Sequence, residues 1–257
     1  MTISSMTQIK PLSTMDFASI SRLDTCTVSN VIERFDVRPR NEGFIYDDVH
    51  CRFPQFSPML GYAVTARIRS STPPATSPPI TRGCYYDRMD FWRHLATVPA
   101  PRVMILQDVD RLPGFGAFVG EIHAQIALAL RCVGCVTNGA VRDLSAVEAT
   151  GFHLFSRRVA VSHAYAHIVD FGDAVEIGGL KIRPGDLVHG DLHGVHVIPL
   201  SIAAEIPKAA AACVAEERSL IAVCQSDTLT LDQLATKLRQ TTQRCIDLDK
   251  ETGKDCG

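Results

Sequence analysis

The chain has 257 residues and a mass of 28.1 kDa, and 46% of its residues are hydrophobic while 21% are charged, so it can bury a substantial core and is not of the disordered class. A formal net charge of −2 and a pI near 6.5 provide no basic field that would attract nucleic acid or an anionic membrane surface. These values favour a small molecule or another protein as the partner.

Cysteine usage and the distribution of apolar residues indicate the compartment. Nine cysteines, an odd number without regular spacing, are typical of free thiols in a reducing environment rather than of a disulfide framework. The N-terminus lacks the pattern of a secretory signal, and no apolar run of roughly 18 residues occurs. We therefore expect a soluble, cytoplasmic protein. Cys132 and Cys135 have no second pair to complete a zinc site, so we expect both in the core.

The first predicted elements are a helix and a strand. The stretch LDTCTVSNVIERF (23–35) places apolar residues at helical spacing, and Asp24, Thr25 or Thr27 can cap its first turn. MLGYAVTARIR then begins with alternating, strand-like residues. The prolines between Pro73 and Pro79 cannot continue a sheet ladder, so we expect an exposed loop there.

The middle of the chain alternates helices and strands. YYDRMDFWRHLATV predicts a helix, and RVMILQDVD (102–110) predicts a buried strand. The glycine-containing loop RLPGFGAFVG leads to a helix that starts near Gly120. VGCVT then predicts a strand, NGAVRD a turn, and LSAVEATG a short helix that Gly151 ends. This alternation indicates an α/β architecture.

From about residue 154 the pattern changes to short strands and turns, among them a type II turn at Pro184-Gly185. Two helices then close the chain, in IAAEIPKAAAACVAEERSLIAV and LDQLATKLRQTTQRCIDL. No internal repeat or second-domain boundary is visible, so we expect a single domain over residues 1–257.

The pair Arg142-Asp143 directly follows a predicted buried strand and directly opens a helix. Unpaired amides and the positive end of the helix dipole favour an anionic ligand at such a position. Arg forks onto a carboxylate, and Asp oxygens suit Mg²⁺ or Mn²⁺, so the pair could hold an oxo-acid together with its cation. The alternative is that Asp143 is only an N-cap and Arg142 a surface partner.

A second candidate lies at GFGAFVGEIHAQ. Glu121 follows Gly120 in the first helical turn, where Ile122 and His123 contribute amides without an intrahelical acceptor. Those amides could bind a substrate carboxylate, and Glu121 could shuttle a proton through water. The alternative is a helix start whose acid only complements the helix dipole.

These motifs give the chain a resemblance to a known family. GEIHAQIALALRCVGCVTNGAVRDLSAVEATGFHLFSR, followed by RPGDLVHGDLHGVHVIP, resembles the RraA-like superfamily. That superfamily includes class II pyruvate aldolases acting on 4-hydroxy-4-methyl-2-oxoglutarate and 4-carboxy-4-hydroxy-2-oxoadipate, and non-catalytic regulators of ribonuclease E. The resemblance covers residues from about 22 to 222, which leaves an N-terminal arm and a C-terminal helical extension.

The resemblance implies a swivelling α/β/β/α domain with extra C-terminal helices, assembled as a homotrimer or homohexamer with active sites between subunits. It implies Arg142 as the clamp on the oxo-acid and Asp143 as the ligand of a divalent metal, Mg²⁺ or Mn²⁺. Gly120, Glu121, Ile122 and His123 would orient water and substrate.

A further acid would come from the C-terminal helix of a neighbouring subunit, where Glu216 and Glu217 are the nearest matches.

The implied activity is a metal-dependent retro-aldol cleavage of a 4-hydroxy-2-oxo acid to pyruvate, with oxaloacetate decarboxylation through the same enolate. Two alternatives stay open. One is a non-catalytic, RraA-like protein that docks on a partner. The other is a metal-dependent lyase or hydrolase with a different substrate.

Histidines in the second half depart from the family pattern. SHAYAH places His163 and His167 four residues apart, and HGDLH places His189, Asp191 and His193 at steps of two, which on a strand would share one face. Such a face could hold a second metal or recognise substrate. The alternative is a hydrogen-bonded structural cluster in which Asp191 closes a turn.

Overall fold

The computed structural model describes residues 11–74 and 88–240. Its helices are α1 (Thr14–Ile20), α2 (Thr25–Arg34), α3 (Met89–Thr97), α4 (Glu121–Ala129), α5 (Leu144–Glu148) and α6 (Ile206–Cys224), with a 3-10 turn at Ala203–Glu205. Its strands are β1 (His50–Cys51), β2 (Met59–Arg69), β3 (Arg102–Asp108), β4 (Ala117–Val119), β5 (Cys132–Val141), β6 (His153–Val159), β7 (His167–Phe171), β8 (Val175–Ile177), β9 (Leu180–Ile182), β10 (Leu187–Asp191) and β11 (Gly194–Ile198).

One mixed sheet organises the chain. Its strand order is β1-β6-β5-β3-β2-β10-β11, with β4 paired to β5 and β7 paired to β2. The central strands β2, β3, β5 and β6 are parallel, while β1, β7, β10 and β11 add antiparallel partners. Parallel strands need covered faces, which explains why β2 is buried along almost its whole length.

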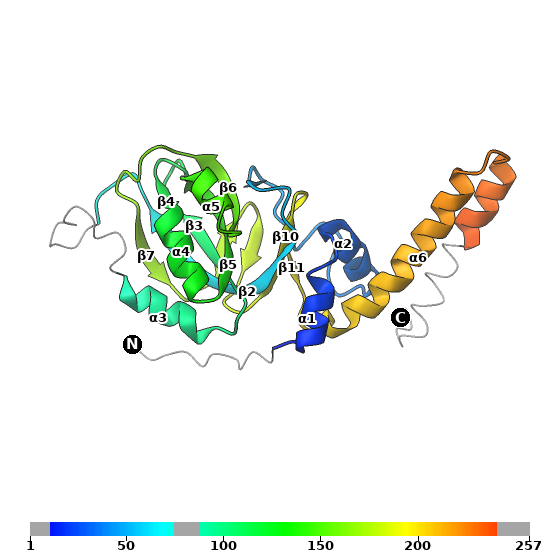
Figure 1. Ribbon diagram of the computed structural model, residues 1–257, viewed down its shortest axis with the longest axis horizontal. Helices are drawn as coiled ribbons and strands as arrows, with labels where there is room; N and C mark the ends of the chain where they lie inside the picture. The colour runs from blue at the N-terminus through cyan, green and yellow to red at the C-terminus, as the bar shows by residue number, and fades with distance from the viewer. Residues whose placement is uncertain (1–10, 75–87, 241–257) are drawn as a thin grey trace.

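The two faces of the sheet carry separate cores because alternate strand residues point in opposite directions. On one face Ala63, Ile105 and Val136 pack with apolar residues of the β8–β9 hairpin. On the other face, residues such as Val64 and Leu106 pack with apolar side chains of α3, α4 and α5. Figure 1 shows these three helices side by side across the sheet.

A second group of helices lies beyond β10 and β11. Helix α6 contacts both α1 and α2 there, and it runs outward from the body of the molecule (Figure 1). Residues 231–240 are also helical. In α6 only Ile206, Ala210 and Cys213 are buried, all in its first half.

Most of the elements predicted from periodicity are confirmed. The expected cap of α2 is present, since the amide of Thr27 donates to Asp24 Oδ1 at 2.8 Å. The buried positions of Cys132 and Cys135 are confirmed as well. The expected proline loop lies mostly outside the described residues, as does the end of the last predicted helix.

Two local predictions were wrong. The segment NGAV is not a turn, because β5 continues to Val141, and part of the expected loop before Gly120 forms β4. The physical reason is lateral pairing: Ala140 lies between Ala117 of β4 and Arg158 of β6. Helix α1 was also not predicted; Ser13 caps it by accepting from the amide of Asp16 at 3.1 Å.

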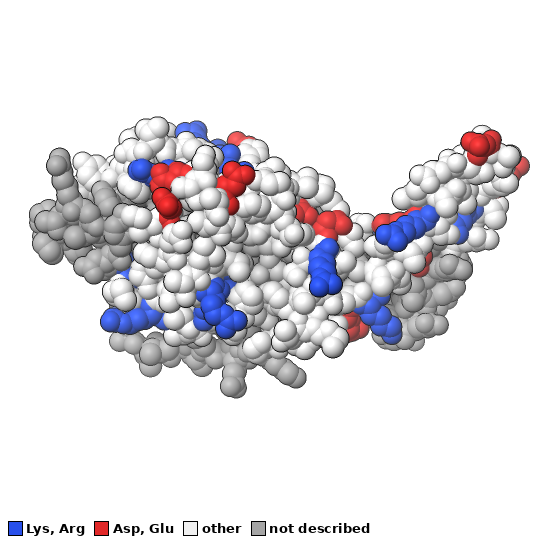
Figure 2. Space-filling model, viewed as in Figure 1, with Lys and Arg blue, Asp and Glu red and all other residues white. Residues whose placement is uncertain are grey.

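The surface carries charges of both signs. On the face shown in Figure 2, Lys and Arg side chains are interspersed with Asp and Glu, and neither sign forms a continuous patch on that face. Among the described residues, no helix combines the length and apolarity that a membrane crossing requires.

Candidate functional site

The candidate residues gather where several parallel strands end. Strand β2 ends at Arg69, β3 at Asp108 and β5 at Val141, and all three run in the same direction. In open α/β sheets this carboxyl edge is where ligands usually bind. Arg142 and Asp143 follow β5 directly, and Gly120 precedes α4 after β4.

Asp143 reaches across to a different helix. It occupies the N-cap position of α5, but its side chain makes no capping bond there. Instead, Asp143 Oδ2 accepts from the amide of Glu121, the first residue of α4, at 3.2 Å, while Arg142 Nε donates to Asp143 Oδ1 at 3.1 Å. The interpretation of Asp143 as merely the cap of its own helix is therefore wrong.

The backbone of Asp143 is strained to achieve this. Its φ of 56° and ψ of 39° lie in the left-handed region that a side chain rarely adopts. Such conformations persist only where the surroundings impose them, and they cluster at functional sites. The strain therefore marks Asp143 as a functional candidate.

The electrostatics keep the Asp143 carboxyl ionised. Burial alone would raise its pKa, but the hydrogen bonds from Arg142 and from the Glu121 amide outweigh burial, with smaller contributions from the charges of Arg142 and His163. The pKa of Asp143 is consequently below its ordinary value. An ionised carboxylate is the form that binds a divalent cation.

Gly120 is required by this close approach. A Cβ atom at Gly120 would lie 2.4 Å from Asp143 Oδ2 and 3.0 Å from Arg142 Cγ. The absence of a side chain lets β4 and the start of α4 contact the Arg142-Asp143 pair directly. The glycine of the predicted Gly-Glu step thus has a steric role.

The first turn of α4 faces two environments. Glu121 and Ile122 are exposed, so the carboxylate and the helix N-terminus are both accessible. His123 is 2% exposed, and its ring lies 4.7 Å from that of Phe118 and 6.1 Å from that of Trp92. Its side chain therefore belongs to the core, which leaves only its backbone amide as a candidate for binding substrate.

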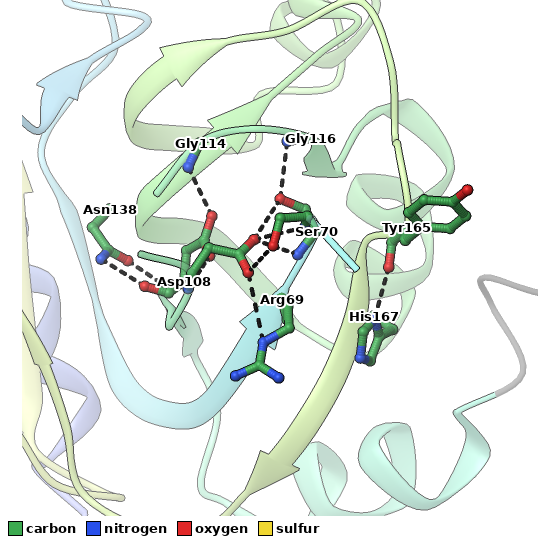
Figure 3. A network of polar contacts seen from close by, with 10 residues as sticks. Arg69, Ser70, Asp108, Gly114, Gly116, Asn138, Tyr165 and His167 are labelled. Carbon is green, nitrogen blue, oxygen red and sulfur yellow. Dashed lines mark hydrogen bonds and ion pairs between the residues drawn. The ribbon is translucent and has the colours of Figure 1, made fainter. Parts of the chain in front are cut away.

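A network of acids that sequence reasoning missed fixes the loop before β4 (Figure 3). Asp110 Oδ2 accepts from the amides of Ser70 and Ser71 at 2.7 and 2.8 Å, while Asp108 Oδ2 accepts from the amide of Gly114 at 2.8 Å. Ser70 Oγ in turn accepts from the amide of Gly116 at 2.9 Å. The ends of β2 and β3 are thereby tied to the segment that leads to Gly120.

The sequence did contain a signal for this network. Asp108 and Asp110 follow a buried apolar run, and buried acids at a strand end need hydrogen-bond donors. Asn138 shows the same logic within β5: its Oδ1 accepts from the Asp108 amide at 2.6 Å and its Nδ2 donates to the Asp108 carbonyl at 3.0 Å. The sequence does not indicate which hydrogen-bond donors bind each of these acids.

His163 and His167 occupy different places. His163 lies against β4, where its Nδ1 is 2.8 Å from the carbonyl oxygen of Ala117, and its charge contributes to the low pKa of Asp143. His167 begins β7, and its Nδ1 is 2.6 Å from the carbonyl oxygen of Tyr165 (Figure 3). The charge of His163 thus acts on the Arg142-Asp143 pair.

The predicted face of His189, Asp191 and His193 is a structural cluster. Asp191 Oδ2 accepts from the amide of Thr25 at 2.8 Å, which joins β10 to the start of α2, and Asp191 Oδ1 accepts from the amide of His193 at 2.8 Å. The prediction that Asp191 closes a turn is confirmed.

His189 is fully buried, and its Nδ1 lies 2.9 Å from Nε2 of His196. Within 11–74 and 88–240, no group of three or more His, Cys, Asp or Glu side chains is arranged to hold a metal, either at these histidines or around Asp143.

Glu216 and Glu217 lie on α6 and bind α2 of the same chain. Arg34 Nη2 donates to Glu216 Oε2 at 2.7 Å, and Asn30 Nδ2 donates to Glu217 Oε1 at 3.1 Å. In this arrangement both glutamates hold the two helices together.

A divalent metal fits the site only in part. Asp143 supplies ionised carboxylate oxygens, the donor type that Mg²⁺ and Mn²⁺ prefer, and Glu121 adds an exposed carboxylate nearby. Mg²⁺ is commonly held by one or two carboxylates with water and substrate oxygens completing its shell. These donors are of the type that a hard divalent cation prefers, and water and substrate would have to supply the rest of its shell.

Comparisons with known proteins identify the family of the chain. The RraA-like model, described as Aldolase/RraA, matches residues 25–197. A protein of Halalkalibacterium halodurans named "Putative 4-hydroxy-4-methyl-2-oxoglutarate aldolase" is 37% identical over 84 residues, which make up 32% of this chain and 40% of that protein. The chain thus aligns with less than half the length of that relative.

Solved structures show the same fold. An uncharacterised protein from Pseudomonas syringae pv. tomato superposes with a TM-score of 0.66 at 24% identity, covering 91% of this chain and 99% of the other. RraAS2 of Streptomyces coelicolor, a member of the RNase ES inhibitor RraA protein family, superposes with a TM-score of 0.61 at 19% identity, covering 83% and 98%. With the family model matching most of the sequence, the chain belongs to the RraA-like family of aldolases and RraA proteins.

Proposed function

We propose that this protein is a divalent-metal-dependent carbon–carbon lyase that cleaves a 4-hydroxy-2-oxo acid and releases pyruvate. The observation that carries the proposal is the Asp143 carboxylate, held in a strained conformation between the Glu121 amide and Arg142. A docking protein has no chemical need for a divalent-ion pocket, which this carboxylate would form. The name of the Halalkalibacterium halodurans relative supports the same reaction class.

Different residues would bind the metal and the substrate. Asp143 would hold Mg²⁺ or Mn²⁺, which when bound supplies a Lewis acid that polarises the 2-oxo group. Arg142 would bind the substrate carboxylate, since a guanidinium carries five N–H donors and only one bond to Asp143 is present. The amides of Ile122 and His123, in the first turn of α4, would bind the remaining oxygens.

Glu121 would carry out the proton transfers through a bound water. A water hydrogen-bonded to its exposed carboxylate would take the proton from the 4-hydroxyl group. The C3–C4 bond then breaks, C4 becomes a carbonyl, and the bond's electrons pass to pyruvate enolate, whose C3 is finally protonated. Arg142 would stabilise the enolate oxygen charge as it develops. Oxaloacetate would lose CO₂ to give the same enolate.

We further propose that the site is completed in a homotrimer or homohexamer. Large apolar side chains are exposed on α4, on the segment before β4 and on the segment between β6 and β7. They are Ile122, then Leu112 and Phe115, then Val161 and Tyr165. A second copy of the chain would cover them and bring an acid to the open side of Asp143. If Glu216 or Glu217 supplies that acid, it must leave its bond to α2, so sedimentation analysis of the assembly should accompany any test of these residues.

The first experiment measures pyruvate release by metal-stripped protein from oxaloacetate and from 4-hydroxy-4-methyl-2-oxoglutarate, with and without Mg²⁺ or Mn²⁺. We expect release only with metal, and we expect Asp143→Ala to abolish it while the oligomer stays intact. Asp232→Ala, which removes an exposed carboxylate from the helix at residues 231–240, is the matched control. Full activity of Asp143→Ala would refute the assignment. Absence of release from folded wild-type oligomer would favour a docking protein or a different substrate.

A further inference from the structure

The outer half of α6 and the helix at residues 231–240 form an arm, residues 214–240, that projects from the body of the molecule (Figure 1). Its second helix has a reciprocal cap, because the Gln233 amide donates to Thr230 Oγ1 at 3.3 Å and the Thr230 amide donates to Gln233 Oε1 at 2.9 Å. Within the described stretch 214–240, however, no residue is buried. Short helices without a core are marginal in water, so we expect the arm to have a partner.

The outer end of the arm combines apolar and acidic side chains. Leu231 is 83% exposed and Leu229 is 38% exposed, and the exposed residues Asp227 and Asp232 flank them in the sequence. Figure 2 shows acidic side chains at this end of the arm. An apolar centre with a charged rim is the usual composition of a protein interface. Residues 226–232 are called the tip below.

A groove between α1 and α6 has the complementary character. It has a volume of about 530 Å³, and Arg22 and Arg218 lie exposed along it. The rest of its lining is mostly apolar and includes Leu23, Pro207, Ala210, Ala211 and Val214. Among the described residues, no ion pair involves either arginine or either carboxylate of the tip. Two positive charges thus border an apolar groove, and two negative charges border an apolar tip.

The positions of the groove and the tip along the arm fit a two-fold pair. Ile221 is 52% exposed and lies three residues after Arg218, so it continues the groove face of α6 outward. It is seven residues from Val214 in the groove, about 10 Å along the helix, and eight residues from Leu229 in the tip. When two α6 helices lie antiparallel with Ile221 at the symmetry axis, the tip of each copy reaches the groove of the other.

We propose that two copies of this chain pair through their arms, with the tip of each copy seated in the α1–α6 groove of the other. Each contact covers the two tip leucines and places two carboxylates beside two arginines. The pairing leaves Glu216 and Glu217 in their contacts with α2. It uses other elements than the Arg142-Asp143 site and does not depend on the proposed lyase reaction. It would double whatever number of copies assembles around that site.

Charge reversal on either side of the contact tests the proposal. The tip variant carries Asp227→Arg and Asp232→Arg, and the groove variant carries Arg22→Asp and Arg218→Asp. In each variant the tip and the groove have charges of the same sign, so the dissociation constant of the pair should rise by about 100-fold or more. Where the wild type is paired, sedimentation velocity should give half of the wild-type mass for each variant.

An equal mixture of the two variants should restore the pair. The acidic tip of the groove variant meets the arginines in the groove of the tip variant, and the basic tip of the tip variant meets the new carboxylates. The mixture should therefore return to the wild-type mass, which a misfolded variant could not do. Arg93→Glu, a charge reversal at an exposed position of α3, is the matched control and should keep the wild-type mass.

Three results would overturn the proposal. The first is the wild-type mass in both charge-reversal variants, and the second is a mixture that stays at half of that mass. The third is a mass that doubles when residues 241–257 are deleted, which would assign the groove to that segment of the same chain. Loss of pyruvate release, by contrast, concerns only the lyase proposal, because the mass of each variant is measured without substrate.

Discussion

Replacing Gly120 by alanine should separate the position of the Asp143 carboxylate from the fold. The backbone at Gly120 has φ −139° and ψ −162°, an extended conformation that alanine adopts readily, so the substitution adds only a methyl group. That methyl group would lie 2.4 Å from Asp143 Oδ2, against an ordinary contact of at least 3.4 Å. The carboxylate must therefore retreat by about 1 Å, because repulsion rises steeply inside van der Waals contact.

The expected cost differs between stability and activity. Asp143 can rotate away at the loss of one amide–carboxylate hydrogen bond, which for this partly exposed group is about 1 kcal/mol in the free energy of unfolding. A displacement of about 1 Å at a reacting centre, by contrast, commonly lowers the rate by about 100-fold. We therefore expect a folded Gly120→Ala protein with severely reduced pyruvate release and weakened Mn²⁺ binding.

A double-mutant cycle identifies the cause. Urea unfolding of Gly120→Ala should show the loss of about 1 kcal/mol in the wild-type background. The loss should be clearly smaller in the Asp143→Ala background, where the clash with Oδ2 is absent and only the 3.0 Å approach to Arg142 Cγ remains. Gln125→Ala, an exposed substitution on the same helix, controls for changes in α4 itself. Wild-type turnover and Mn²⁺ affinity in Gly120→Ala would refute the steric argument.

Three further predictions concern the acids and histidines outside the pair. Asp110→Ala removes the acceptor for the Ser70 and Ser71 amides and should lower the free energy of unfolding by about 2–4 kcal/mol, measured by urea denaturation; unchanged stability would contradict the role of the network. Asp191→Ala should lower Tm without changing the number of Mn²⁺ ions bound, whereas loss of a bound ion would reinstate a second metal site. Burial lowers the pKa of His189 to about 4, so the unfolded chain takes up a proton first as pH falls below its ordinary value near 6.5. The contribution of His189 to the free energy of unfolding is then fully present above that pH and is lost toward pH 4, by at most about 1.4 kcal/mol per pH unit. His189→Gln should therefore reduce the dependence of the free energy of unfolding on pH between about 6.5 and 4.

Features that depend on near neighbours could be predicted from the amino-acid sequence. Helical spacing and the Asp24 cap specify α2, the apolar run specifies β3, and the glycine at 120 marks the start of α4. These features are set by local propensity and by side chains a few residues apart, which a single sequence displays directly. The NGAVRD motif likewise indicates Arg142 and Asp143 as candidate ligands of substrate and metal.

The hydrogen-bond partners of those candidates depend on the folded arrangement of distant segments. The Asp143 carboxylate binds an amide 22 residues earlier in the chain, and Asp191 binds Thr25 across 166 residues. Strand β4 exists because Ala117 and Val119 find partners in β5, and NGAV extends a strand because neighbours flank it on both sides. Hydrogen bonds between distant segments form only once packing brings the segments together, and no local pattern encodes which donor a buried acid will find.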